Sequence, residues 1–162
     1  MKILIVSDTH GREENLEKAV LREAPFDLLI HCGDVEGREF IIEAMAECPC
    51  YIVAGNNDFF SDLPYEEQLM LANKKVLVTH GHSYGISAHD YDHLAERAQE
   101  RGFQVVLFGH IHRPVIEENE GVLLINPGSL EFPRQKGRQP SYAVMRIDTL
   151  NAIHVDFQYL DY

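Results

Sequence analysis

Residues 3–10 read ILIVSDTH, an apolar run that stops abruptly at side chains able to bind a metal ion. The run from Lys2 to Ser7 is short, continuous and rich in β-branched residues, which is typical of a buried β-strand. Asp8 and His10 follow it at once. An apolar strand that ends in a carboxylate and an imidazole is the pattern from which we predict both the fold and the site.

Four further apolar runs end in the same kinds of residue. Strands are predicted at 27–31, 51–54, 75–79 and 104–108, and each is followed by such a group: Cys32-Gly33-Asp34, Gly55-Asn56-Asn57-Asp58, His80-Gly81-His82 and Gly109-His110-Ile111-His112. Helix-period stretches lie between the strands at 14–23, 40–46 and 88–101, with an amphipathic segment around 69–71. Buried strands that alternate with helices predict an α/β fold whose sheet is covered on its faces.

The last third of the chain changes character. Runs at 115–118 and 122–125 flank Asn119-Glu120-Gly121, which predicts a β-hairpin, and runs at 141–147 and 153–159 repeat the pattern around Thr149-Leu150-Asn151. The prolines, glycine and cationic side chains between Phe132 and Pro140 indicate one exposed loop. We expect a single domain over residues 1–162.

The composition excludes several classes of function. The 162 residues hold 14 Lys and Arg against 26 Asp and Glu, a formal charge of −12, which argues against broad binding to nucleic acid. No apolar run approaches the roughly 20 residues that cross a bilayer. Cys32, Cys48 and Cys50 lack the spacing of a disulfide framework, and Cys48-Pro49-Cys50 has no second pair to complete a zinc site. We therefore expect a cytoplasmic protein without membrane association.

The five strand ends are expected to form one site, because ligands collect outside the carboxyl ends of strands in an open α/β sheet. Carboxylate, amide and imidazole groups suit Mn²⁺, Fe²⁺, Zn²⁺ or Ni²⁺. Residues i and i+2 of an extended chain point to the same side, so both members of Asp8-x-His10 and His110-x-His112 should face one metal or a metal pair. Asp-x-His, Gly-Asp and Gly-Asn-Asn-Asp are each common alone at strand ends and in turns, whereas Gly109-His110-Ile111-His112 is more specific, because two imidazoles are costly to bury without partners. The recurrence of all five motifs in order favours a shared metal site.

The ordered set Asp8-x-His10, Gly33-Asp34, Gly55-Asn56, His80-Gly81-His82 and Gly109-His110-x-His112 resembles the motifs of calcineurin-like metallophosphoesterases. Within that superfamily it most resembles the small bacterial and archaeal phosphodiesterase branch, which also carries Asn126-Pro127-Gly128-Ser129 and Ser141-Tyr142-Ala143. The main match covers about residues 1–129. The resemblance implies a four-layer αββα sandwich of two mixed β-sheets flanked by helices; the pairing of two sheets comes from the resemblance alone.

The resemblance also implies a dinuclear metal centre in a metal-dependent phosphodiesterase. One metal would be held by Asp8, His10, Asp34 and His112, and the other by Asp34, Asn56, His80 and His110, with Asp34 as the bridge. Two divalent ions per chain are expected, Mn²⁺ first, with Ni²⁺, Fe²⁺ or Zn²⁺ as alternatives. Such ions lie about 3.5 to 4 Å apart, and a hydroxide between them would attack the phosphorus of a small phosphodiester substrate.

Asp34, Asn56, Asn57 and His82 are the candidate catalytic residues. Many members of the superfamily carry His directly after the motif asparagine, where this chain has Asn57. An amide donates a hydrogen bond but no proton, so we expect a preference for esters with good leaving groups. His82 acts as a catalytic group or, as we favour, orients the site through a hydrogen bond to a carboxylate. His89 and His93 fit an i, i+4 pair on a helix but match no ligand of the family.

Two alternative functions stay open. A eukaryotic retromer subunit is similar in fold and size, but its metal site is degraded and it serves as a non-catalytic protein-binding scaffold. Every ligand position is filled here, which disfavours that function. A phosphomonoesterase or protein phosphatase is the second alternative, and Asn57 and the small size of the chain weaken it. The apolar late strands are compatible with a homo-oligomer.

Overall fold

Ten strands and three α-helices make up the computed structural model, which describes residues 1–161. In chain order they are β1 (Lys2–Val6), α1 (Glu14–Glu23), β2 (Leu28–His31), α2 (Glu39–Ala46), β3 (Cys50–Ile52), β4 (Glu66–Leu71), β5 (Lys74–Thr79), a 3₁₀ turn (His82–Tyr84), α3 (Asp92–Glu100), β6 (Val105–Phe108), β7 (Pro114–Asn119), β8 (Val122–Pro127), β9 (Ser141–Ile147) and β10 (Ile153–Tyr159).

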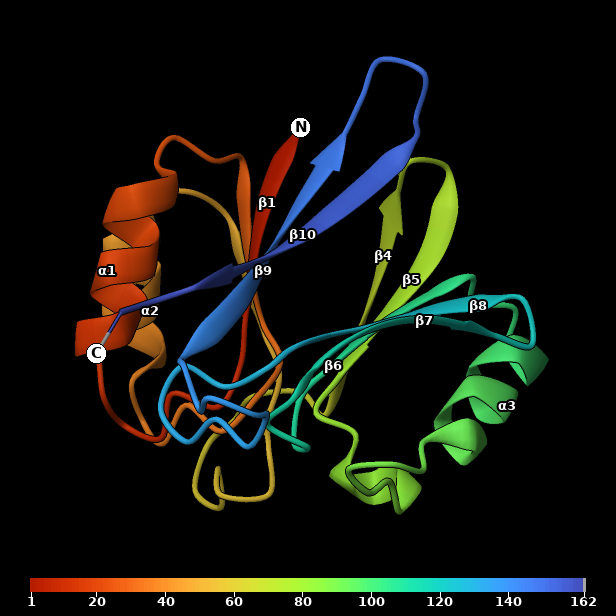
Figure 1. The fold of residues 1–162 in the computed structure, drawn as a ribbon, viewed down its shortest axis with the longest axis horizontal. Helices are drawn as coiled ribbons and strands as arrows, with labels where there is room; N and C mark the ends of the chain where they lie inside the picture. Colours follow the sequence, from red (N-terminus) through yellow and green to blue (C-terminus); the bar gives the residue numbers. More distant parts are fainter. Residues whose placement is uncertain (162) are drawn as a thin grey trace.

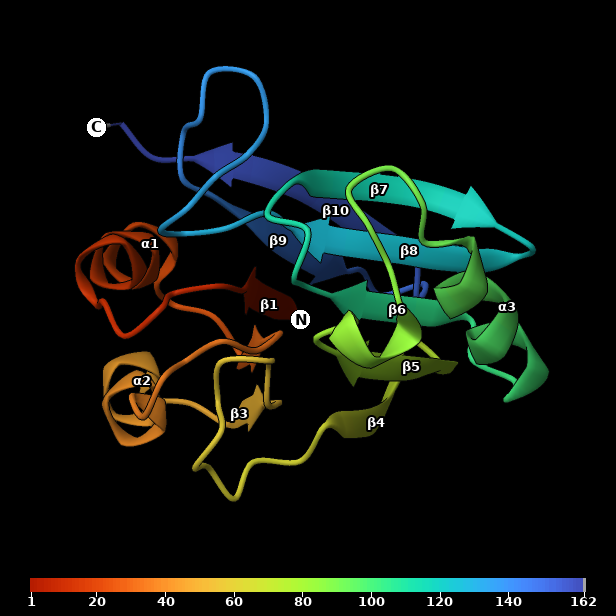
Figure 2. The same cartoon turned by 90° about the horizontal axis from the view of Figure 1, so that it is seen from below.

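The strands form two mixed five-stranded sheets, with strand orders β10-β9-β1-β2-β3 and β4-β5-β6-β8-β7. β1, β2 and β3 are parallel, as are β5, β6 and β8, and the remaining strands join antiparallel. The sheets face each other, with α1 and α2 outside one and α3 outside the other (Figures 1 and 2). This arrangement confirms the predicted four-layer sandwich.

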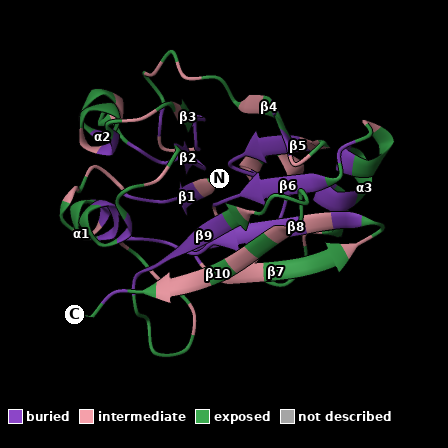
Figure 3. Cartoon of the chain, turned by 90° about the horizontal axis from the view of Figure 1, so that it is seen from above, coloured by how far each residue is buried: buried purple, intermediate pink, exposed green. Residues whose placement is uncertain are grey.

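Three apolar layers explain why the central strands β1, β2 and β6 consist almost entirely of hydrophobic residues. Alternate residues such as Ile3 and Ile5 pack between the two sheets, against Val76 and Leu107 of the second sheet. The intervening residues of each sheet face its helices, where Leu4 of β1 packs with Leu16 of α1 and Ile42 of α2, and where Val106 of β6 packs with Leu94 of α3. Buried residues accordingly fill β1, β2, β5 and β6 on both faces (Figure 3). Each such side chain contributes about 1.5–3 kcal/mol on burial.

The predicted elements differ from the observed ones mainly at their ends. The helix predicted at 88–101 begins only at Asp92, because Ser87 and Asp90 pair as an isolated β-bridge. The amphipathic segment around 69–71 belongs to strand β4. The hairpin of β7 and β8 turns through Glu120 and Gly121, both at positive φ (52° and 75°), as a two-residue turn requires. None of the helices among residues 1–161 is long and apolar enough to cross a membrane.

The architecture places the predicted site residues at one end of the sandwich. The loops after β1, β2, β3, β5 and β6 gather there, together with the long loop between β8 and β9 (Figure 1). Residues that lie up to 104 positions apart in the sequence, such as Asp8 and His112, are therefore brought into contact.

Candidate metal centre

One group of candidate ligands contains Asp8, His10 and His112, whose ligand atoms all lie within 4.8 Å of one another. Oδ1 of Asp8 is 3.0 Å from Nε2 of His112 and 4.0 Å from Nε2 of His10. Asp8 is fully buried, yet its Oδ1 has no hydrogen-bond partner among the described residues, and neither has Nε2 of His10. Buried polar atoms without partners are rare and costly, and here they face a common point, as ligands of a cation do.

A second group converges on the side-chain oxygen of Asn56. Oδ1 of Asn56 lies 3.0 Å from Nε2 of His80 and 2.9 Å from Nδ1 of His110. Asp34 lies between the two groups, since its Oδ2 is 3.5 Å from Nε2 of His80 and 3.8 Å from Nε2 of His10. The structure thus brings together all seven residues predicted as ligands, with Asp34 in the shared position.

Three of the four histidines are oriented by a hydrogen bond on the ring nitrogen that faces away from the site. Nδ1 of His10 donates to Oε1 of Glu36 (2.7 Å). Nδ1 of His80 donates to the carbonyl of Cys32 (2.7 Å), and Nδ1 of His112 donates to the carbonyl of Phe132 (2.8 Å). Because these partners are acceptors only, Nδ1 carries the proton in each neutral ring and Nε2 faces the site. Metal-binding histidines are commonly fixed in this way.

The electrostatics of the site favour positive charge at its centre. Burial lowers the pKa of His80, but hydrogen bonding to Asp34 and the charges of Asp8 and Asp34 raise it above its ordinary value. Burial raises the pKa of Asp8, but His112 and His80 outweigh burial and hold it below its ordinary value. Burial also raises the pKa of Asp34, and His80 is the main group that lowers it below its ordinary value. Two buried carboxylates therefore stay ionised, and a proton or a metal ion must neutralise them.

The backbone reaches this geometry by turns, which corrects the expectation of an extended chain. Asp8, His10, His110 and His112 all have positive φ, between 47° and 70°. Side chains at i and i+2 converge because the backbone enters the left-handed region, not because they share one side of a strand. Non-glycine residues in this region store about 1–3 kcal/mol of strain each, and such residues cluster at functional sites.

Two glycines allow the turns to approach one another closely. A Cβ atom on Gly55 would lie 2.1 Å from Oδ1 of Asp34, and one on Gly109 would lie 2.1 Å from Oγ of Ser7. Neither position can hold a larger residue unless the neighbouring turn moves. Glycine, which has no Cβ, is therefore the residue that allows this close backbone approach.

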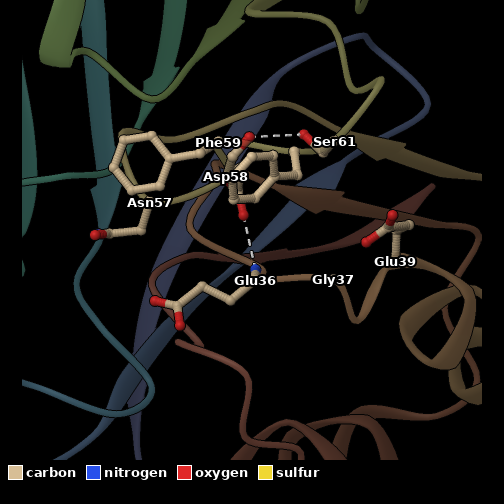
Figure 4. Close-up of a pocket in the computed structure, with 8 residues that line it drawn as sticks. Glu36, Gly37, Glu39, Asn57, Asp58, Phe59 and Ser61 are labelled. Atoms are coloured by element: carbon tan, nitrogen blue, oxygen red, sulfur yellow. Dashed lines mark hydrogen bonds between the residues drawn. The ribbon is translucent and has the colours of Figure 1, made fainter.

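Asp58 is a residue whose role the sequence analysis missed. Its buried carboxylate accepts hydrogen bonds from the backbone N–H groups of Asp34 (2.8 Å), Gly55 (2.7 Å), Val35 (3.3 Å) and Glu36 (2.7 Å). The bond to Glu36 is visible in Figure 4. Asp58 therefore joins the turn after β2 to the turn after β3. The available signal was its spacing, because an aspartate three residues after a glycine turn can bond back to the turn's N–H groups.

Asn57 contacts Asp34 through two hydrogen bonds. Its amide Nδ2 donates to Oδ2 of Asp34 (2.7 Å) and its backbone N–H donates to Oδ1 (2.9 Å). In this structure Asn57 therefore orients the carboxylate that lies between the two ligand groups.

The hydrogen bond expected from His82 to a carboxylate does not occur among residues 1–161. His82 starts the 3₁₀ turn after Gly81, which has φ 99°, so the chain turns away from the direction of β5 at this point. Its Nδ1 is buried without a partner in the described part of the chain, and its ring centroid lies 5.4 Å from that of His80 and 6.3 Å from that of His110. Burial and the neighbouring His80 lower the pKa of His82 below its ordinary value.

The other histidines lie outside the ligand groups. His31 is buried behind the site, where its Nδ1 accepts the N–H of Gly33 and its Nε2 donates to Oγ1 of Thr9; burial lowers its pKa to about 4. His89 precedes α3, so it does not form the predicted helical pair with His93, which is exposed. His154 is an exposed residue of β10.

Comparison with known proteins identifies the relatives of the chain. The family model described as a calcineurin-like phosphoesterase superfamily domain matches residues 1–150. The probable metallophosphoesterase YsnB of Bacillus subtilis is 42% identical over 151 residues, which covers 91% of this chain and 85% of that protein. Phosphodiesterase MJ0936 of Methanocaldococcus jannaschii is 33% identical over 147 residues, which covers 79% and 83% respectively.

A solved structure shows the same fold. It is the crystal structure of a conserved uncharacterized protein, a predicted phosphoesterase, from Streptococcus pneumoniae TIGR4. The two structures superpose with a TM-score of 0.81 at 31% sequence identity, and the match covers 98% of this chain and 88% of that one.

Proposed function

The chain belongs to the calcineurin-like phosphoesterase superfamily, and from this premise we propose that it is a phosphodiesterase with two divalent metal ions at one centre. Membership of the family supports a metal-dependent phosphoesterase. The observation that carries the finer proposal is the position of Asp34, whose Oδ2 lies between Nε2 of His10 (3.8 Å) and Nε2 of His80 (3.5 Å). A carboxylate in that position can serve both ligand groups.

The residues present fit two metal ions. Asp8, His10 and His112 would hold one ion, Asn56, His80 and His110 would hold the other, and Asp34 would be shared. The unpartnered Oδ1 of Asp8 and Nε2 of His10 support the first position, and the approach of two imidazole nitrogens to the amide oxygen of Asn56 supports the second. Nitrogen and oxygen donors of this kind suit Mn²⁺, our first choice, and also Ni²⁺, Fe²⁺ or Zn²⁺.

The bound ions would neutralise a phosphate oxyanion and lower the pKa of water enough to supply hydroxide at neutral pH. The protein's own part is to hold the ligands still. Glu36, Cys32 and Phe132 fix three imidazole rings, and Asn57 and Asp58 fix the turn that carries Asp34. Such orienting contacts commonly change metal affinity or activity by about 10- to 100-fold.

The charge of the protein makes the ions necessary for substrate binding. The chain carries −12, and the two buried carboxylates at the site remain ionised. A phosphodiester would be repelled by them, since like charges brought together out of water are strongly unfavourable. Cations at this position reverse the local sign, which a small anionic substrate requires.

The proposal is tested by hydrolysis of bis(p-nitrophenyl) phosphate and of p-nitrophenyl phosphate by the full chain, after chelation and then with Mn²⁺, Ni²⁺, Zn²⁺ or Fe²⁺. We expect metal-dependent turnover with the diester preferred, and its loss in Asp34→Asn and His80→Ala. His154→Ala, an exposed histidine on β10, is the matched control and should behave as wild type. A folded, metal-loaded protein without turnover of either ester would overturn the proposal and favour a binding function.

A further inference from the structure

The loop from Phe132 to Pro140 is anchored directly to the candidate ligands. Oγ of Ser129 donates to the carbonyl of Asp8 (3.0 Å) and accepts the N–H of Phe132 (2.8 Å). The carbonyl of Phe132 accepts from Nδ1 of His112 (2.8 Å), and the N–H of Arg134 donates to the carbonyl of His112 (2.9 Å). The start of the loop is therefore held in a fixed place beside the metal centre.

This loop is cationic in an acidic protein. Residues 132–140 contain Arg134, Lys136 and Arg138 and no acidic residue, whereas the whole chain carries −12. The preceding Glu131 is already paired, because its Oε1 lies 2.5 Å from Nη1 of Arg12. Among the described residues no hydrogen bond or ion pair holds the side chain of Arg134 or of Lys136, and both are exposed. Their charges are available to a ligand.

A cavity of about 540 Å³ lies along the loop, lined by Glu131, Phe132, Pro133, Arg134 and Arg138. Its volume is within the range of about 300–1,000 Å³ that is usual for small-molecule sites. Phe132 is half exposed, and its ring centroid lies 4.9 Å from that of His10. The ring therefore forms the boundary between the metal centre and the cationic cavity.

The second cavity beside the metal centre has the opposite charge. It is lined by Glu36 and Glu39 together with Asn57, Phe59 and neighbouring residues (Figure 4). Glu36 is also the residue that accepts from Nδ1 of His10. A further anionic group of a substrate is disfavoured there and favoured on the side of Arg134.

We propose that the cationic loop binds a second phosphate group of the substrate, with Arg134 as the specificity-determining residue. The inference rests on the proposed phosphodiesterase function and names a substrate class for it: a phosphodiester that carries a second phosphate group. A guanidinium matches phosphate because it donates two parallel, charge-assisted hydrogen bonds. Lys136 adds charge without that fixed geometry.

Two chromogenic esters that differ only in the second phosphate test the inference. Thymidine 5′-(p-nitrophenyl phosphate) has one phosphodiester, and its 3′-phosphorylated form adds the second anion with the same leaving group. We expect the wild type to show a ratio of kcat/KM of about tenfold or more in favour of the 3′-phosphate form, as one charge-assisted contact provides. Arg134→Gln should bring this ratio close to one. Arg97→Gln, an exposed arginine of α3, is the matched control and should keep it.

The outcomes separate this inference from the proposed function. Metal-dependent hydrolysis of both esters at equal kcat/KM would overturn the inference and leave the phosphodiesterase standing, as would an unchanged ratio in Arg134→Gln. If neither ester is hydrolysed, the proposed function fails. In that case calorimetric titration with thymidine 3′,5′-bisphosphate and thymidine 5′-monophosphate tests the inference by affinity, without any turnover. Equal affinities for the two nucleotides would overturn the inference.

Discussion

Oδ2 of Asp58 lies 2.8 Å from the backbone nitrogen of Asp34 and accepts its hydrogen bond. The same carboxylate binds three further N–H groups, of Val35, Glu36 and Gly55. An ionised oxygen pair inside a protein satisfies several donors at once, and bonds to charged groups are the stronger kind. Asp58 thus fixes two ligand-bearing turns relative to each other without belonging to either group of candidate ligands.

Replacing Asp58 by asparagine should lower both stability and metal affinity. The substitution removes the charge and turns an NH₂ group toward backbone donors. The free energy of unfolding should fall by about 2–3 kcal/mol. For a chain of this size the midpoint of thermal unfolding should fall by roughly 5–10 °C. Calorimetry checks the unfolding, and titration with Mn²⁺ checks the affinity. Asp62→Asn, an exposed residue of the same loop, should change neither, and an Asp58→Asn variant equal to it would contradict the role.

A histidine in place of Asn57 should change the dependence of the rate on the leaving group. The amide of Asn57 donates to Oδ2 of Asp34 and has no proton to give, so esters with poor leaving groups should react slowly. An imidazole can protonate the leaving oxygen, and general acids contribute about 10²- to 10⁴-fold. Rates for a series of substituted phenyl methyl phosphodiesters should depend less steeply on leaving-group pKa in Asn57→His. The same slope in Asn57→His and Asn57→Ala would contradict proton donation at this position.

The sequence predicted where the site lies better than it predicted the backbone geometry of the site. Five strand ends with ligand residues were enough to place Asp8, Asp34 and His80 together, because parallel strands deliver their carboxyl ends to one edge of a sheet. The left-handed backbone at Asp8 and His110 was not predictable from spacing, since it depends on contacts between turns that are distant in sequence. For the same reason the role of Asp58 was not predicted. Three of its four hydrogen bonds reach residues that lie more than twenty positions away.

The packing of two sheets against each other was likewise not predictable from residue patterns. Ile3 of β1 and Val76 of β5 both read as buried, but nothing in either run specifies that the two strands belong to separate sheets packed face to face. A covered parallel sheet produces the same continuous apolar pattern. Only the resemblance to a known family predicted two sheets packed face to face, and the structure confirms this arrangement.

Glu23 should stabilise the fold in a pH-dependent way. Burial raises the pKa of this carboxyl group, but hydrogen bonds from Lys2 and Tyr142 outweigh burial and lower it below its ordinary value of 4.5. Because the pKa is lower in the folded state, the stabilisation is fully present above about pH 4.5 and is lost as the pH falls through the folded value. Thermal unfolding of wild type and Glu23→Gln should differ most near pH 6 and converge toward pH 3.

Glu17→Gln serves as the control for this measurement, because Glu17 is exposed on the same helix. Its unfolding midpoint should follow that of the wild type across the whole range. A gap between wild type and Glu23→Gln that stays constant from pH 6 to pH 3 would show that the carboxylate's charge does not matter, and that only the shape of the side chain does.

Replacing His110 should separate the two ligand groups by metal stoichiometry. His110 approaches Asn56 (Nδ1 to Oδ1, 2.9 Å), whereas Asp8, His10 and His112 form their own group. We expect calorimetric titration and elemental analysis to find two Mn²⁺ per wild-type chain and one in His110→Ala, with His154→Ala keeping two. Bound metal stabilises the folded chain by mass action, about 2.7 kcal/mol at a hundredfold excess over Kd, so chelation should lower the unfolding midpoint more in wild type than in His110→Ala. A single ion in the wild type, lost completely in His110→Ala, would instead indicate one mononuclear site in which both groups share the same metal.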